Sequence, residues 1–128
     1  MISAITRGIK VSVETFYQPE YSDPLGLHFL FSYRITIANH SDLPVQLLRR
    51  HWFITDGAGQ QREVEGEGVV GEQPLLQPGQ SYEYVSGCDF KTEIGKMHGT
   101  YLMQKIDDGK LFYITIPEFI MVTPMKLN

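Results

Sequence analysis

The segment FLFSYRITI, residues 29–37, decides the fold class. Its apolar and aromatic residues recur at every second position, with polar and mixed residues between them. Successive side chains of a β-strand point to opposite faces, so this two-residue period indicates a strand with one buried face. We therefore predict a strand here, with Phe31, Tyr33 and Ile35 together on one face.

Further strand-like segments follow between turn signals. Asp56-Gly57 and Asp107-Asp108-Gly109 favour the positive φ angles of tight hairpins. In residues 45–55 the apolar residues stand first at odd-numbered and then at even-numbered positions. One β-bulge near Arg49 would place both sets on the same face of the strand. Two prolines in residues 18–24 exclude a helix and a central strand. The expected strands span residues 9–13, 29–37, 45–55, 61–70, 81–86, 97–106 and 111–116, with an interruption at Pro117 and a continuation over 119–122.

About seven alternating strands without helical periodicity predict an all-β fold. We expect an immunoglobulin-like or fibronectin type III β-sandwich of two antiparallel sheets, with an up-and-down barrel as the alternative. The Cys…Trp…Cys pattern of antibody domains is absent, which favours the fibronectin type III subclass. A length of 128 residues fits one core, so residues 1–128 are predicted to form a single domain.

Charge and cysteine content narrow the partners and the compartment. The net charge is −4 and the longest basic run is Arg49–His51, so the cationic surface that drives nucleic-acid binding is missing. The single cysteine, Cys88, cannot form an internal disulfide, which fits a reducing cytosol. No apolar stretch approaches the roughly 18–20 residues that span a bilayer. We expect a soluble cytoplasmic protein without membrane insertion.

The string GEGVVG, residues 66–71, matches the GxGxxG pattern. In dinucleotide-binding folds these glycines bring a backbone close to pyrophosphate at a helix N-terminus. Two prolines in residues 72–79 leave no room for that helix, so close backbone packing in a sheet is the favoured interpretation. The alternative is a backbone nest that binds an anion without a helix. Its candidate residues are Gly66, Gly68, Gly71, Arg49 and Arg50.

No catalytic or metal-binding constellation is evident. The four histidines form no HxH or HxxxH pair, and one cysteine cannot complete a structural zinc site. Asp107 and Asp108 are typical of a polar turn rather than of a magnesium site. Cys88 stands beside Asp89, whereas a reactive thiol needs nearby positive charge. We expect no catalytic residue, no bound metal, no cofactor and no enzyme activity.

Several motifs, in order, resemble the signature of the ApaG family. YVSG at 84–87, followed by GKMHGTY at 95–101, resembles its Tyr-x-Ser-Gly and Gly-x-Met-x-Gly-x-Tyr steps. RHW at 50–52 with ITDG at 54–57 resembles its central strand, and the glycine string also fits. The resemblance covers nearly the whole chain. Further matching positions are Asn39, Pro44, Val45, Phe112, Ile116, Pro117 and Phe119.

The resemblance implies a fibronectin type III-like sandwich and no defined reaction. Bacterial members of the family are associated with cobalt resistance and magnesium efflux, and eukaryotic F-box and polymerase-interacting proteins carry related domains for which a protein-interaction role is inferred. A soluble chain cannot itself move an ion across a bilayer, so the resemblance implies at most assistance to a transporter.

Two hypotheses of different class follow. The first is a non-catalytic interaction module that offers edge strands and end loops to a protein partner, or pairs with a second copy as a homodimer. Exposure of Tyr17, Tyr21 and Phe90 in loops would favour it. The second is a binder, or less readily a hydrolase, of pyrophosphate, nucleotide or polyphosphate through the Gly66–Gly71 loop, which needs the neighbouring arginines to face that loop. We favour the first.

Overall fold

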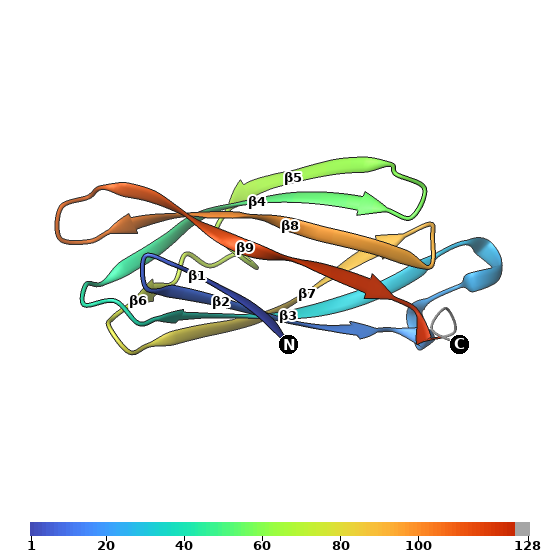
Figure 1. Ribbon diagram of the computed structural model, residues 1–128, viewed down its shortest axis with the longest axis horizontal. Helices are drawn as coiled ribbons and strands as arrows, with labels where there is room; N and C mark the ends of the chain where they lie inside the picture. The colour runs from blue at the N-terminus through green and yellow to red at the C-terminus, as the bar shows by residue number, and fades with distance from the viewer. Residues whose placement is uncertain (125–128) are drawn as a thin grey trace.

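The computed structural model describes residues 1–124, which form two antiparallel β-sheets packed face to face (Figure 1). The all-β sandwich prediction is confirmed, and the expected domain end at residue 128 lies outside the described residues. Two short 3-10 turns, η1 (Pro19–Tyr21) and η2 (Pro24–Gly26), occupy the proline-rich segment between two strands. The strands are β1 (Ile2–Thr6), β2 (Ile9–Tyr17), β3 (Phe29–Asn39), β4 (Val45–Asp56), β5 (Gln61–Glu67), β6 (Leu75–Leu76), β7 (Ser81–Phe90), β8 (Ile94–Lys105) and β9 (Leu111–Val122).

The strand order is that of a fibronectin type III sandwich with two additions. The first sheet runs β1-β2-β3-β7, and the second runs β5-β4-β8-β9 with β6 beside β4. Without β1 and β6, three strands face four, as expected from about seven predicted strands. The sequence missed β1 because its side chains are mostly exposed on both faces, which leaves no clear alternation. It missed β6 because that strand has two residues.

Two register shifts explain the irregular strands. The predicted bulge in β4 is confirmed, since its pairing with β8 shifts between Leu47 and Arg49. The interruption expected at Pro117 is wrong, because β9 continues through it. Pairing between β8 and β9 shifts between Met97 and Gly99, opposite Pro117, so the missing proline N–H falls at an irregularity of the ladder.

The core lies between the two sheets and is rich in aromatic residues. The residues of β3 alternate between buried and half-buried, as the sequence period predicts. Trp52 of β4 packs edge-on against Tyr33 and Phe119, with ring centroids 5.5 and 5.8 Å away. Such edge-to-face contacts add to the free energy gained by burying the rings.

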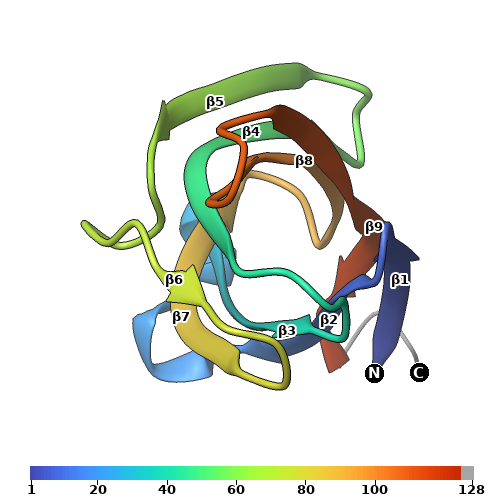
Figure 2. The same cartoon turned by 90° about the vertical axis from the view of Figure 1, so that its left-hand side faces the viewer.

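The edges of the two sheets differ on the two sides of the sandwich. On one side β1 lies beside β9, and the Thr115 N–H donates to Thr6 Oγ1 at 3.1 Å (Figure 2). On the other side, β7 and β5 are the outer strands of their sheets. None of the described residues forms a helix of the length and apolarity that a membrane span requires.

Candidate functional site

The glycine string forms the end of β5 and a tight hairpin turn. The Val69 N–H donates to the Glu72 carbonyl at 2.8 Å, and the Glu72 N–H donates to the Val69 carbonyl at 2.9 Å. The two central residues, Val70 and Gly71, have φ angles of 48° and 78°. Positive φ at both positions is the pattern of a type I′ turn. The string ends in this turn, and the next element is β6 rather than a helix.

Close backbone approach accounts for Gly68 and Gly66. A Cβ atom on Gly68 would lie 2.2 Å from the Glu72 carbonyl oxygen, and one on Gly66 would lie 2.8 Å from the Arg50 guanidinium. The Gly68 N–H already donates to the Leu48 carbonyl at 2.8 Å. With the two amides of the turn, three N–H groups of this segment are committed to carbonyls. A backbone nest binds an anion through its N–H groups. Because these three N–H groups are already hydrogen-bonded to carbonyls, this segment is poorly suited to bind an anion.

The two predicted arginines point to different sides of β4. Arg50 reaches the glycine loop, where Nη1 donates to the carbonyls of Glu67 and Gly68 at 3.0 and 3.1 Å. Arg49 lies with His51 on the outer face of the second sheet, in a surface depression. The structure therefore brings Arg50 to the predicted anion loop, where the loop presents carbonyl oxygens to it, and places Arg49 elsewhere.

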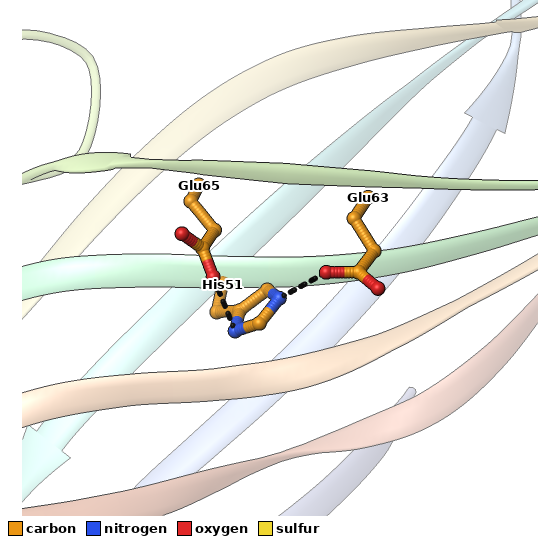
Figure 3. Close-up of side chains that lie close together, drawn as sticks. All are labelled: His51, Glu63 and Glu65. Carbon is orange, nitrogen blue, oxygen red and sulfur yellow. Dashed lines mark hydrogen bonds and ion pairs between the residues drawn. The ribbon is translucent and has the colours of Figure 1, made fainter.

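The same outer face carries a cluster that the sequence did not reveal. His51 lies between Glu63 and Glu65 of the neighbouring strand (Figure 3). Its Nε2 is 3.0 Å from Glu63 Oε2, and its Nδ1 is 3.1 Å from Glu65 Oε1. The imidazole stacks on Phe53, with centroids 4.4 Å apart. The signal in the sequence is the alternating Glu-x-Glu that follows a hairpin turn, but assigning it needs the register of β4 and β5.

β7 is an outer strand whose charged residues are Glu83 and Asp89. Its ten residues pair with β3 in a register that has no shift. Natural proteins blunt long edges with lysine, proline or bulges, and residues 81–90 contain no lysine and no proline. The other edges are better protected. β5 carries Glu63, Glu65 and Glu67 on one face, and β9 contains Pro117 and lies beside β1.

The odd-numbered residues of β7 turn their backbone groups away from β3. Just before β7, the Asn39 N–H donates to the Gln80 carbonyl at 2.9 Å, and antiparallel strands alternate residues that face the partner with residues that face away. The Asp89 carbonyl fits this alternation, because it accepts a bond from Arg62 of β5 at 2.6 Å. Arg62 thus occupies one end of the edge, and within residues 1–124 no further strand pairs with the outward side of residues 81–87.

Most of the remaining candidate residues take part in core packing or in local hydrogen bonds. Tyr21 is exposed, but Tyr17 ends β2 against the core and Phe90 is buried in β7, so the predicted loop positions of these two are wrong. Cys88 is buried and accepts a bond from Arg62 Nη2 at 3.2 Å, and burial raises the pKa of its thiol. The Asp108 carboxylate accepts the Lys110 N–H at 2.9 Å within its turn.

These features define a two-sheet β-sandwich of the fibronectin type III kind, whose candidate sites lie on a sheet edge and on an outer sheet face. The ApaG domain model matches residues 19–105. The chain is 49% identical to "Protein ApaG" of Sinorhizobium fredii over 97% of this chain and 95% of that one. It is 48% identical to the same-named protein of Anaeromyxobacter dehalogenans over the full length of both. The crystal structure of a Bordetella pertussis protein called ApaA superposes with a TM-score of 0.88 at 46% identity, covering 91% of this chain and 94% of that one. The chain belongs to the ApaG family.

Proposed function

We propose that the chain is a non-catalytic interaction module that binds an extended segment of a partner protein along β7. The open edge of that strand is the observation that carries this function. A peptide laid beside it would bond to the outward N–H and C=O groups of Glu83, Val85 and Gly87 and would add a strand to the first sheet.

Side chains next to this edge add selectivity. Successive residues of an added strand alternate between the outer face of the sheet and the opening between the sheets. The half-buried Tyr82 and Ser86 lie on the inward side, and Glu83 and Val85 lie on the outward side. Glu83 is 3.4 Å from Arg34 of β3, so an added basic side chain would compete for a carboxylate that is already paired. Alternating apolar and small polar residues therefore suit this edge best.

The alternative function, pyrophosphate or nucleotide binding at residues 66–71, has one supporting feature. The Arg50 guanidinium does lie at the loop, but it donates to loop carbonyls there. An amide NMR titration with pyrophosphate and with ATP, each with and without magnesium, separates the two. Saturable shifts at Gly66, Gly68 and Gly71 would favour the anion loop.

In this proposal, the family association with cobalt resistance and magnesium efflux would depend on which partner protein binds to β7. A cytoplasmic interaction module would influence ion resistance by binding a component of that system. This part rests on the resemblance alone and is tested by identifying the segment that binds β7.

A displayed library of extended 12-residue peptides provides the first probe. Peptides selected on the wild-type protein should protect the amides of Glu83, Val85 and Gly87 from hydrogen exchange. Val85→Pro should weaken their binding about tenfold or more, because it removes one outward N–H and fills its place. Its thermal unfolding should change little, because that N–H is not bonded to β3. Glu63→Pro on the edge strand β5 is the matched control, because the backbone of the odd-numbered β5 residues also faces away from the partner strand β4.

Two outcomes would redirect the assignment. Peptide-induced shifts confined to another face, with Val85→Pro binding as well as wild type, would contradict β7 as the docking edge. Concentration-dependent dimerisation that Val85→Pro abolishes would make a second copy of this chain the occupant, which is the homodimer considered from the sequence.

A further inference from the structure

We propose that His51, Glu63 and Glu65 form a binding site for a first-row divalent metal ion such as Zn²⁺ on the outer face of the second sheet. This site is independent of the β7 edge, which belongs to the first sheet. Figure 3 shows both carboxylates directed at the imidazole from the neighbouring strand.

The donor atoms are close enough for one ion. One ring nitrogen and one oxygen from each carboxylate all lie within 4.8 Å of one another. Zinc binds imidazole nitrogen and carboxylate oxygen at about 2.0–2.2 Å, so its ligand atoms stand roughly 3–4 Å apart. Because Glu63 now faces Nε2 and Glu65 faces Nδ1, one of the two glutamate side chains would have to rotate toward the nitrogen that binds the ion. These side chains are 61% and 56% exposed, which leaves them free to rotate.

The backbone places all three side chains on one face. The bulge between Leu47 and Arg49 changes the parity of β4 and turns His51 outward. Register then sets Glu65 directly opposite His51, and Glu63 opposite Phe53. Side chains two apart on one strand share a face, so the two carboxylates flank the imidazole. Sites built on strands hold their geometry better than sites built on loops.

Aromatic stacking orients the imidazole. Phe53 stacks on His51 at 4.4 Å and on His98 of β8 at 5.2 Å, with interplanar angles of 28° and 16°. The three rings form a row across β4 and β8. A fixed ring plane lowers the conformational entropy that an ion would have to remove.

The local charge is net negative, because three glutamates of β5 share this face with Arg49. Glu63, Glu65 and Glu67 occupy alternate positions of β5 on one face, where like charges repel. Within residues 1–124, the ion pairs found for Glu63 and Glu65 are both with His51. When the imidazole is neutral, these two carboxylates have no cationic partner there, and a divalent ion would supply one. A protonated imidazole could hydrogen-bond to both carboxylates in this arrangement. It would therefore compete with the metal ion.

The donor set predicts which ion binds. Imidazole nitrogen suits zinc, nickel, copper and iron, whereas Mg²⁺ and Ca²⁺ prefer ligand sets made of oxygen alone. One nitrogen and two carboxylate oxygens should therefore select Zn²⁺ over Mg²⁺. Three protein ligands leave at least one coordination position open to water.

Calorimetric titration of the untagged protein with Zn²⁺ measures the site. We expect one ion per chain, with binding weakened about tenfold or more in Glu65→Gln and in His51→Gln, since each removes a ligand. His28→Gln is the matched control. His28 also sits near a carboxylate, with Nε2 3.7 Å from Asp89 Oδ2, but it has no second carboxylate within ion-pair range among the described residues. An excess of Mg²⁺ should not displace Zn²⁺.

A paramagnetic probe locates the ion without relying on affinity. Co²⁺ should broaden the amide NMR signals of β4 and β5 around residue 51 first, and Glu65→Gln should remove that effect. The proposal is overturned if Zn²⁺ binds Glu65→Gln as tightly as wild type, if broadening centres on His28 or His40, or if no heat is detected at millimolar Zn²⁺. Trp52 fluorescence during urea unfolding verifies that each variant is folded.

Discussion

Gly68→Ala should destabilise the fold far more than Gly71→Ala, although both change a glycine of the same motif. Gly68 has a φ of 63°, which costs an alanine about 1 kcal/mol. Its new Cβ would lie 2.2 Å from the Glu72 carbonyl oxygen, so the turn backbone would have to move. Overpacking of that kind costs about 1–3 kcal/mol, which gives a total of about 2–4 kcal/mol.

Gly71 provides the matched comparison. Its φ of 78° carries a similar conformational cost, but a Cβ there meets nothing within 4 Å. We therefore expect about 1 kcal/mol for Gly71→Ala. Gly66→Ala should also cost less than Gly68→Ala, because the atoms it meets are the end of the flexible Arg50 side chain.

Urea unfolding at 25 °C, followed by the fluorescence of Trp52, measures these differences. Trp52 is the single tryptophan and is 3% exposed in the core, so its emission reports global unfolding. The free energy of unfolding follows from linear extrapolation. Equal destabilisation by Gly68→Ala and Gly71→Ala would refute the idea that backbone packing, rather than turn conformation alone, fixes this motif.

Three further predictions concern buried polar groups. Asn39→Ala should lower the free energy of unfolding by about 2–4 kcal/mol, because this fully buried side-chain amide hydrogen-bonds to three backbone groups. A decrease in the unfolding temperature of under about 3 °C would contradict this prediction. Tyr84→Phe and Tyr101→Phe should each cost about 1–2 kcal/mol of unfolding free energy, because their hydroxyl groups hydrogen-bond to each other in the core. The double variant should lose less than the sum of the two single losses. Additive losses in a double-mutant cycle would show that the pair is uncoupled. Burial raises the pKa of the Cys88 thiol and of both tyrosine hydroxyls, so these groups stay neutral in the folded state at pH values where the unfolded chain has ionised them. Stability should therefore be insensitive to these groups at neutral pH and fall as the pH rises above about 8.5 for the thiol and about 10 for the tyrosines. Cys88→Ala should delay the onset of that loss, and a urea midpoint that stays constant from pH 7 to pH 10.5 would contradict the assignment.

Much of the architecture could be predicted because a half-buried β-strand produces an alternating apolar pattern in its own short stretch of sequence. Alternation in residues 29–37 places side chains on two faces, and this holds whatever strand lies next to them. The parity change in residues 45–55 likewise predicted a bulge, which the pairing of β4 with β8 confirms at Leu47 and Arg49. The strands that were missed, β1 and β6, are exposed or very short, so burial leaves little pattern in them.

The glycine string shows where a motif misleads without its context. The prolines after residue 71 correctly indicated that no helix follows, so the dinucleotide interpretation failed at the sequence level. Which glycine packs closely could not be predicted, because the Glu72 carbonyl beside Gly68 and the guanidinium beside Gly66 come from the turn and from β4. The direction of Arg49 depended in turn on the bulge.

The sequence by itself determined the fold class, the family and the parity of each long strand, because these depend on residue spacing along one chain. The tertiary structure decided which strand has an open outer edge and which side chains meet across strands. The open edge of β7 follows from strand order, and the meeting of His51 with Glu63 and Glu65 follows from the register of β4 and β5. Both are relations between distant segments, set by hydrogen bonding between strands and by burial of the shared core, and neither leaves a mark in local spacing.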